Sequence, residues 1–375
     1  MSSKRFLALF GAGFLTVAGV VVSLNMYLDV YGLFRPARGR YIGIYGEERV
    51  AKYLHSFRYI PENFDGVLLG SSVSDNLDTR NFPEYRLYNA SIDGGNVADL
   101  LPIAENVFRK RELKLTIVCI HRYLTNDHAL KTDFMSSREY WGALASPQLF
   151  TSYVSRLAIR SGIVTGFYDD FGTRRLEANI DVKTVHQNVN AAVVDIRRGI
   201  ARVGDYHIDP LALTQLASML AIARNRSQLL VVFYPPTPAP ILAACAGEIA
   251  TYNKTINGLL RPDDILIDFN APQYASIRDD YHNFVDAVHL SNSGANRVLV
   301  DLGRAIASAE QARRTGSPTL PTATSSREIG STMVGDEAPR LEHGRYSRST
   351  RPLYGNGAEK ASVWPLRQSS PKKKS

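Results

Sequence analysis

The chain is organised around residues 65–76, which have the sequence DGVLLGSSVSDN. Their apolar part, residues 66–69, is too short for a helix and has the continuous apolar composition of a strand covered on both faces. Gly70 permits a tight turn after this strand, and the polar residues beyond it predict the beginning of a helix. Such a turn would lift a serine hydroxyl to the carboxyl edge of a parallel sheet, beside backbone N–H groups that can hold an oxyanion.

A serine hydroxyl becomes a nucleophile only when a neighbouring base takes its proton. The candidate base lies far downstream, in the sequence DAVHLS of residues 286–291. Asp286 and His289 are three residues apart, so in a turn they can lie side by side. The carboxylate would then orient and stabilise the imidazole, while the other ring nitrogen faces the serine.

The G-S-S-V-S block and the later D-x-x-H-L-S-x-x-G block, in this order, resemble the SGNH (GDSL-like) hydrolases. The resemblance is greatest to membrane-anchored members that carry G-S-S in place of G-D-S, and it covers roughly residues 65–306. It implies that Ser72 is the nucleophile, with Asp286 and His289 as its partners. The family's second block supplies an oxyanion glycine, for which Gly94 is the best match and Gly95 the alternative.

The third block of the family is incomplete in this chain. It normally places G-x-N-D after a strand, and the Asn side chain donates to the oxyanion. Here the sequence after the strand is HRYLTND, so Asn126 is displaced from the strand end and the glycine is missing. Asn126 is therefore a candidate oxyanion donor, whereas His121, at the exit of the strand, either faces the site or is a structural histidine.

Five apolar segments alternate with helical patterns, which predicts a parallel sheet with right-handed crossovers. The resemblance implies a three-layer α/β/α, flavodoxin-like fold with strand order 2-1-3-4-5, and this order brings Ser72 and His289 together at the carboxyl edge. The expected strands are residues 66–69, 86–89, 113–120, 228–234 and 265–269, and the expected helices between and after them are 97–110, 211–223, 241–260 and 294–307.

A helical insert interrupts this pattern at about residues 128–209. We expect helices at 140–145, 148–161 and 185–203, and a further helix at 46–59 before the first strand. Inserts of this length inside compact domains commonly form lids or walls of binding sites. The arginines in the insert either present cations to an acidic polymer or lie on solvated helix faces.

The N-terminal segment predicts a membrane anchor. Residues 6–24 carry no charge, and about 19 apolar residues span a bilayer as a helix. Lys4 and Arg5 precede this run and predict a cytoplasmic N-terminus. A cleavable signal peptide is the alternative, but the run is longer than such segments usually are and no A-x-A sequence follows it. The predicted layout is a cytoplasmic end (1–5), an anchor (6–28), a juxtamembrane segment (29–60), the SGNH-like domain (61–309) and a disordered basic tail (310–375).

Charge and cysteine content exclude some classes of function. The formal charge of the 375 residues is +8, and residues 313–375 hold twelve Lys or Arg against five Asp or Glu, which is +7 of it. The domain is therefore nearly neutral, which argues against nucleic-acid binding. Cys119 and Cys245 both lie in apolar contexts and are predicted to be buried free thiols. With no metal-ligand spacing, we predict no metal and no cofactor.

The resemblance implies a serine esterase or O-acyltransferase that acts on acyl esters, in particular acetyl esters, of envelope or secreted polysaccharide. Such a protein would be anchored once in the bacterial inner membrane, with its domain in the periplasm or otherwise outside the cytoplasm. The alternative is a catalytically inactive SGNH-fold envelope protein that binds glycan or partner proteins, which the incomplete third block favours. A dinucleotide-binding enzyme is disfavoured because no G-x-G-x-x-G follows the first strand.

Overall fold

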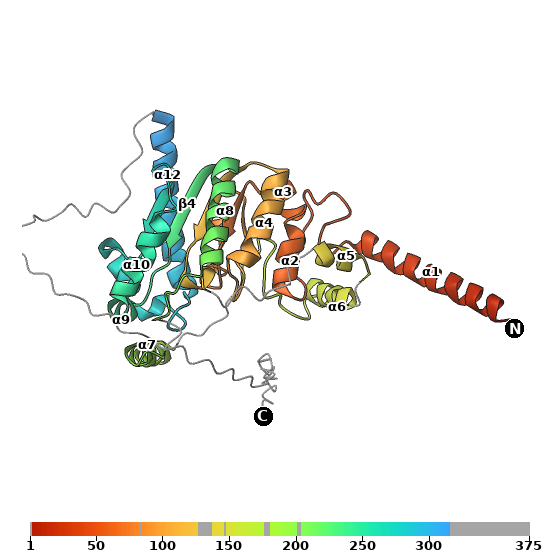
Figure 1. The fold of residues 1–375 in the computed structure, drawn as a ribbon, viewed down its shortest axis with the longest axis horizontal. Coiled ribbons are helices and arrows are strands. Elements are labelled where there is room, and N and C mark those ends of the chain that lie inside the picture. The colour runs from red at the N-terminus through yellow and green to blue at the C-terminus, as the bar shows by residue number, and fades with distance from the viewer. Residues whose placement is uncertain are drawn as a thin grey trace, which may run out of the picture. The chain divides into compact units, whose positions relative to one another are not determined.

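The computed structural model describes residues 2–82, 84–126, 137–145, 148–175, 181–200 and 204–315. These residues contain a five-stranded, all-parallel sheet of order β2-β1-β3-β4-β5, which confirms the predicted topology. Figure 1 shows the sheet, with β4 labelled, among the helices that cover it. The strands are β1 Gly66–Leu69, β2 Leu87–Asn89, β3 Leu113–Cys119, β4 Ser227–Tyr234 and β5 Ile265–Asp268.

The register aligns the carboxyl ends of the strands at one edge of the sheet. Leu69, the last residue of β1, lies opposite Val118 of β3, and Cys119 at the end of β3 lies opposite Phe233. The chain segments that leave β1 and β3 therefore emerge side by side.

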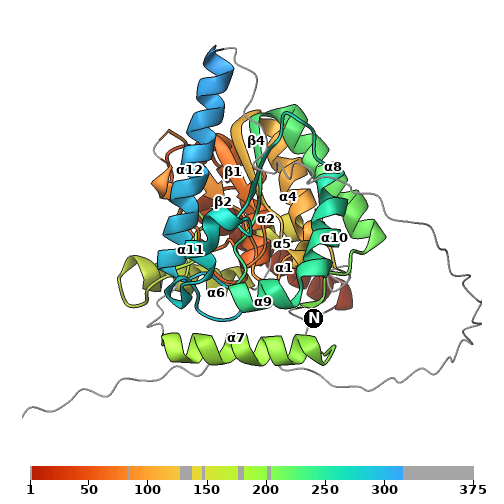
Figure 2. The same ribbon diagram turned by 90° about the vertical axis from the view of Figure 1, so that its left-hand side faces the viewer.

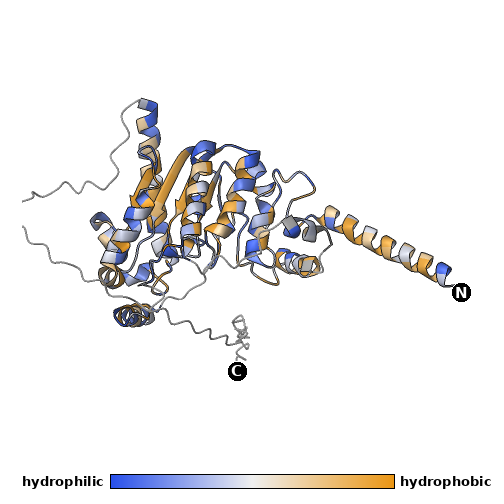
Figure 3. Cartoon of the chain, viewed as in Figure 1, coloured by the Kyte–Doolittle hydropathy of each residue, from blue (hydrophilic) through white to orange (hydrophobic). Residues whose placement is uncertain are grey.

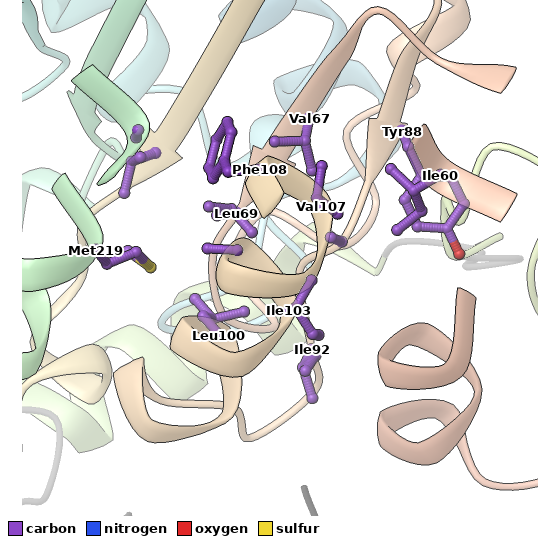
Figure 4. Packing of buried hydrophobic residues seen from close by; sticks show 14 of the residues in the cluster. Ile60, Val67, Leu69, Tyr88, Ile92, Leu100, Ile103, Val107, Phe108 and Met219 are labelled. Carbon is purple, nitrogen blue, oxygen red and sulfur yellow. The ribbon is translucent and has the colours of Figure 1, made fainter. Parts of the chain in front are cut away.

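Helices cover both faces of the sheet, so the fold has the three layers expected. Helices α4 (Val97–Lys110) and α8 (Pro210–Arg226) lie on one side, and α12 (Asn292–Thr315) lies on the other (Figure 2). Because successive strand residues point to opposite faces, Val67 and Leu69 pack in the core beneath α4 and α8 (Figure 4). Leu68 packs instead in the core beneath α12.

Two predicted helices are each divided in the structure. Residues 46–59 form α2 (Glu48–His55), and α3 (Tyr59–Asn63) begins at the last of them. Residues 241–260 form α9 (Ala239–Ala244) and α10 (Ala246–Asn257). The break at Cys245 lets the two helices serve different neighbours, because α9 packs against α7 whereas α10 places Tyr252 and Ile256 in the core. Cys119 and Cys245 are free and buried, as predicted.

The closing helix is longer than predicted. We expected the folded domain to end at residue 309, but α12 continues to Thr315, with Ala309 and Ala312 buried. Arg313 donates to the carbonyl oxygen of Gln228 at the start of β4, so the last turn of α12 is bound to the sheet. The rest of the predicted basic tail, residues 316–375, lies outside the described residues.

The insert contains helices α5 (Ser137–Ala145), α6 (Gln148–Arg160) and α7 (Val182–Arg197). Residues 168–175, between α6 and α7, run along the outer edge of the sheet, where the N–H of Asn89 in β2 donates to the carbonyl of Phe171 at 2.7 Å. The insert thus covers an edge strand that would otherwise present unpaired backbone groups.

Helix α1 (Ser3–Leu28) precedes the domain and is long and apolar enough to span a membrane. Its most apolar stretch is not buried against any other part of the protein, and its surface is predominantly hydrophobic (Figure 3). It begins three residues before the predicted span, at Ser3, and ends at the predicted residue, Leu28.

Candidate active site

The turn after β1 requires a residue without a side chain at its first position. A Cβ at Gly70 would lie 2.1 Å from Ser74 Oγ and 2.9 Å from the Cβ of Cys119. Ser74 is itself held in place, because its Oγ lies 2.8 Å from Ser91 Oγ. The strand therefore turns so closely that Ser72 is presented at the carboxyl edge.

We expect Gly70→Ala to lower the free energy of unfolding by about 3 kcal/mol, the upper part of the usual cost of overpacking a core. Urea unfolding of the detergent-solubilised protein measures the change. Gly247→Ala is the matched control, because no atom lies within 4 Å of a Cβ there and alanine favours helix α10 by about 0.5–1 kcal/mol. Equal stability of Gly70→Ala and the native protein would contradict the close turn.

The predicted helix after Ser72 is absent, and this prediction was wrong. Residues 72–76 form successive turns, followed by a short 3₁₀ helix, Thr79–Asn81. The Nδ2 of Asn89 in β2 donates to the carbonyls of Ser74, Asp75 and Leu77, which are acceptors that an α-helix would use for its own N–H groups. A side chain from the neighbouring strand thus replaces helical hydrogen bonding.

Ser72, His289 and Asp286 form a continuous hydrogen-bonded chain. Ser72 Oγ lies 2.9 Å from His289 Nε2, and His289 Nδ1 lies 2.8 Å from Asp286 Oδ2. The structure therefore brings together the serine and the two downstream residues that the sequence analysis selected, although 217 positions separate Ser72 from His289.

Local hydrogen bonds fix the loop that carries the histidine. Asp286 Oδ1 accepts the backbone N–H groups of Val288 and His289, each at 2.7 Å. Ser291 Oγ accepts the N–H of Gly294 at 3.1 Å at the start of α12. The loop is also bound to the serine turn, because Asn76 Nδ2 donates to the carbonyl of Leu290 at 2.9 Å.

The charges of Asp286 and His289 favour proton transfer from the serine. Burial alone would raise the pKa of Asp286, but the hydrogen bond and charge of His289, with two backbone N–H groups, bring that pKa below its ordinary value. Burial would lower the pKa of His289, yet the hydrogen bond and charge of Asp286 outweigh it and raise that pKa above 6.5. Asp75 and Asp93 contribute to the same rise. The imidazole is therefore a stronger base than a free histidine.

Within the described part of the chain, the Gly94 N–H is free to act as a donor, and the Gly95 N–H is not. The Gly95 N–H donates to the carbonyl of Ile92 at 2.9 Å, so it is already used. Gly94 adopts a φ of 59°, in the left-handed region that favours glycine, and its N–H has no acceptor among the described residues. Arg49 of α2 holds this turn, since its Nη2 donates to the carbonyls of Asp93 at 3.3 Å and Gly94 at 2.8 Å.

His121 carries an unpaired donor at the carboxyl edge. Val118 of β3 lies opposite Leu69 of β1. His121 is three residues after Val118, and Ser72 is three residues after Leu69, so each residue follows its strand by the same number of positions. The Nε2 of His121 is 3.1 Å from Arg122 Nη1, and a guanidinium only donates, so the ring proton of neutral His121 is on Nδ1. This Nδ1 is buried and has no hydrogen-bond partner among the described residues. Burial, Arg122 and His289 all lower the pKa of His121, which favours its neutral form.

Asn126, the other third-block candidate, lies elsewhere in the loop. It follows a short 3₁₀ helix, Arg122–Leu124, and is buried. In the part of the chain that the structure describes, it makes no hydrogen bond to Ser72 or His289. The preceding Thr125 is bound by its Oγ1 to Tyr252 at 3.0 Å.

Arg174 of the insert connects the serine turn to the glycine turn. Its Nη1 lies 3.1 Å from Asp75 Oδ2 and 2.9 Å from Asp93 Oδ2. Burial raises the pKa of Asp75 to about 7, although Lys52 and Arg174 act to lower it. The insert therefore contributes a charge that sequence analysis did not assign to the site. Only the repeated arginines of the insert pointed toward it.

Among the described residues, no cluster of three or more His, Cys, Asp or Glu side chains could hold a metal ion.

Comparison with protein-family models finds no match for this chain, and comparison with curated proteins finds none either. A solved structure from Streptococcus pneumonia, described as "a putative platelet activating factor", is similar over 80% of this chain and 100% of its own. The two are 10% identical, and the TM-score is 0.34. A likeness at this TM-score says nothing about the activity of this protein.

Proposed function

We propose that this protein is an SGNH-type serine esterase or O-acyltransferase that works through an acyl-serine intermediate. The observation that carries the proposal is the hydrogen-bonded chain from Ser72 through His289 to Asp286, at the edge of a parallel sheet where ligands of such folds bind. The unpaired N–H of Gly94 and the Nδ1–H of His121 are the further donors that we assign to the site.

In the first half-reaction, His289 Nε2 accepts the proton of Ser72 as Oγ attacks the acyl carbonyl carbon. The negative charge that develops on the carbonyl oxygen is stabilised by the backbone N–H groups of Ser72 and Gly94. The tetrahedral intermediate collapses when the ester C–O bond breaks, and His289 returns the proton to the departing alcohol. In the second half-reaction, His289 activates water or a sugar hydroxyl, which takes the acyl group from Ser72.

His121 is the third oxyanion donor in this proposal, in place of Asn126. We expect His121→Ala to lower kcat by about 10²- to 10³-fold, the usual loss when one oxyanion donor is removed, with little change in KM. Steady-state hydrolysis of p-nitrophenyl acetate measures this. Asn126→Ala is the matched comparison and should retain most activity. A larger loss in Asn126→Ala than in His121→Ala would return the role to the asparagine.

The resemblance to anchored SGNH proteins supports the proposed substrate class, and α1 supports the proposed location. We propose acetyl esters of envelope or secreted polysaccharide as substrates. In this arrangement α1 crosses the bacterial inner membrane once, Lys4 and Arg5 keep the N-terminus in the cytoplasm, and the domain lies outside it.

The group that accepts the acyl group from Ser72 distinguishes hydrolysis from transfer: water in hydrolysis, and a sugar hydroxyl in transfer. The full chain in detergent is supplied with p-nitrophenyl acetate and an acceptor oligosaccharide, and free acetate and acetylated oligosaccharide are both quantified. Formation of either product by the native protein, and of neither by Ser72→Ala, supports the proposed activity and identifies its acceptor. Lack of turnover by a folded native protein would favour the binding-protein alternative.

A further inference from the structure

Helix α6 and the segment after it expose six large apolar side chains, which we call the α6 apolar face. Positions 150, 154 and 157 have the spacing of one helix face, and positions 163, 164 and 167 follow. The six residues, Phe150, Val154, Leu157, Ile163, Val164 and Phe167, are between 51% and 78% exposed. Large exposed apolar side chains that recur on one helix face are typical of an interaction site.

The neighbouring face of α6 binds the end of α1. Tyr153 donates its hydroxyl to Asn25 Oδ1, and Arg156 Nη1 donates to the carbonyl of Leu28 at 2.9 Å. Asn25 and Leu28 lie just beyond the uncharged residues 6–24. Helix α6 therefore lies where α1 would leave the membrane, and Figure 1 shows α5 and α6 beside the domain end of α1.

The residues around this junction have the composition of a membrane interface. Tyr27, at the end of α1, is exposed, and the guanidinium of Arg35 lies 5.4 Å from the centre of its ring. Arg160 at the end of α6 is also exposed. Aromatic rings and basic side chains beside an apolar helix face are typical of helices that lie in the plane of a bilayer surface.

We propose that the α6 apolar face inserts into the surface of the bilayer that α1 spans, on the side of the domain. The apolar side chains enter the boundary of the acyl chains, and the arginines meet anionic head groups. This inference rests on α1 being a membrane anchor and is independent of the reaction at Ser72. It gives the domain a second attachment, so the domain cannot rotate freely about the end of α1.

Docking of α6 also fixes the site relative to the membrane. Only seven positions separate Phe167 of the apolar face from Arg174, which binds Asp75 and Asp93 beside the catalytic serine. The site is thereby held at one height above the bilayer, which favours substrates close to the membrane surface.

Depth-dependent fluorescence quenching of the full chain in phosphatidylcholine and phosphatidylglycerol vesicles tests this inference. A single cysteine is introduced by Leu157→Cys in a Cys119→Ala and Cys245→Ala background and labelled with an environment-sensitive fluorophore. Leu15→Cys in α1 and Val300→Cys on the exposed side of α12 are the controls. We expect the label at position 157 to shift its emission to the blue and to be quenched by lipids labelled near the head group. The label at 15 should be quenched by deeper lipid labels, and that at 300 by neither.

Quenching at position 15 without quenching at position 157 would overturn the inference while leaving the anchor in place. Shielding of position 157 from aqueous iodide without quenching by lipid would also overturn it, because a partner protein or a second copy would then cover the face. No lipid quenching at position 15 would contradict both the membrane anchor and this inference. Phe150→Cys gives an independent reading on the same face if Leu157→Cys disturbs folding.

Discussion

Replacing Ser72 by alanine is expected to lower kcat for ester turnover by about 10⁶-fold, the loss found when a serine nucleophile is removed from a hydrogen-bonded triad. Ser72 Oγ is the hydroxyl bonded to His289 Nε2, so without it His289 can act only on water. Release of p-nitrophenol by the full chain in detergent measures the effect.

Ser71→Ala is the matched control for this variant. Ser71 is the neighbouring serine, is fully buried, and its Oγ has no hydrogen-bond partner among the described residues. Removing an unsatisfied buried hydroxyl should not impair folding, and we expect nearly native turnover. Loss of activity in Ser71→Ala with retention in Ser72→Ala would assign the nucleophile to the other serine.

Asp286→Asn is expected to lower kcat by about 10⁴-fold, because an amide no longer holds the histidine in the reactive tautomer. It should also change the pH dependence. His289 must be neutral to accept a proton, and its pKa is raised above 6.5 by Asp286, so native kcat/KM should fall as the pH drops through that raised pKa. Without the carboxylate the pKa of His289 falls, and this limb of the profile should move to lower pH.

The pH profile of kcat/KM measures the shift, with Asp93→Asn as the control. Asp93 also raises the pKa of His289, but less than Asp286 does. The acidic limb of the Asp93→Asn profile should therefore move less than that of Asp286→Asn. A profile that keeps its position in Asp286→Asn would show that the carboxylate does not act on the titrating group.

The sheet could be predicted because buried parallel strands need little more than local composition. Val67 to Leu69 are buried on both faces of β1, and such strands are continuous apolar runs in the sequence. The same holds for β3 and β4. Ser72, Asp286 and His289 could be selected because they lie in two short sequence blocks that carry the resemblance to the SGNH hydrolases. Asp286 and His289 are also close enough in sequence to pair within one turn.

Features that depend on contacts between distant segments were missed. The helix expected after Ser72 does not form because Asn89, from the next strand, binds its carbonyl groups. Arg49 and Arg174 lie 44 and 81 positions from the Asp93 atoms that they bind. No local pattern identifies such partners. His121 was seen at the strand exit, but its unpaired donor became evident only from the contact with Arg122 and its burial.

The most direct test of a catalytic Ser72 is mass spectrometry of the full chain after reaction with a fluorophosphonate, alongside His289→Ala. The proposed mechanism predicts one adduct on Ser72 in the native protein, because His289 removes the Ser72 proton as Oγ attacks phosphorus and the P–F bond breaks to release fluoride. It predicts no adduct in His289→Ala. No adduct on the folded native protein, or an adduct on another residue, would contradict it.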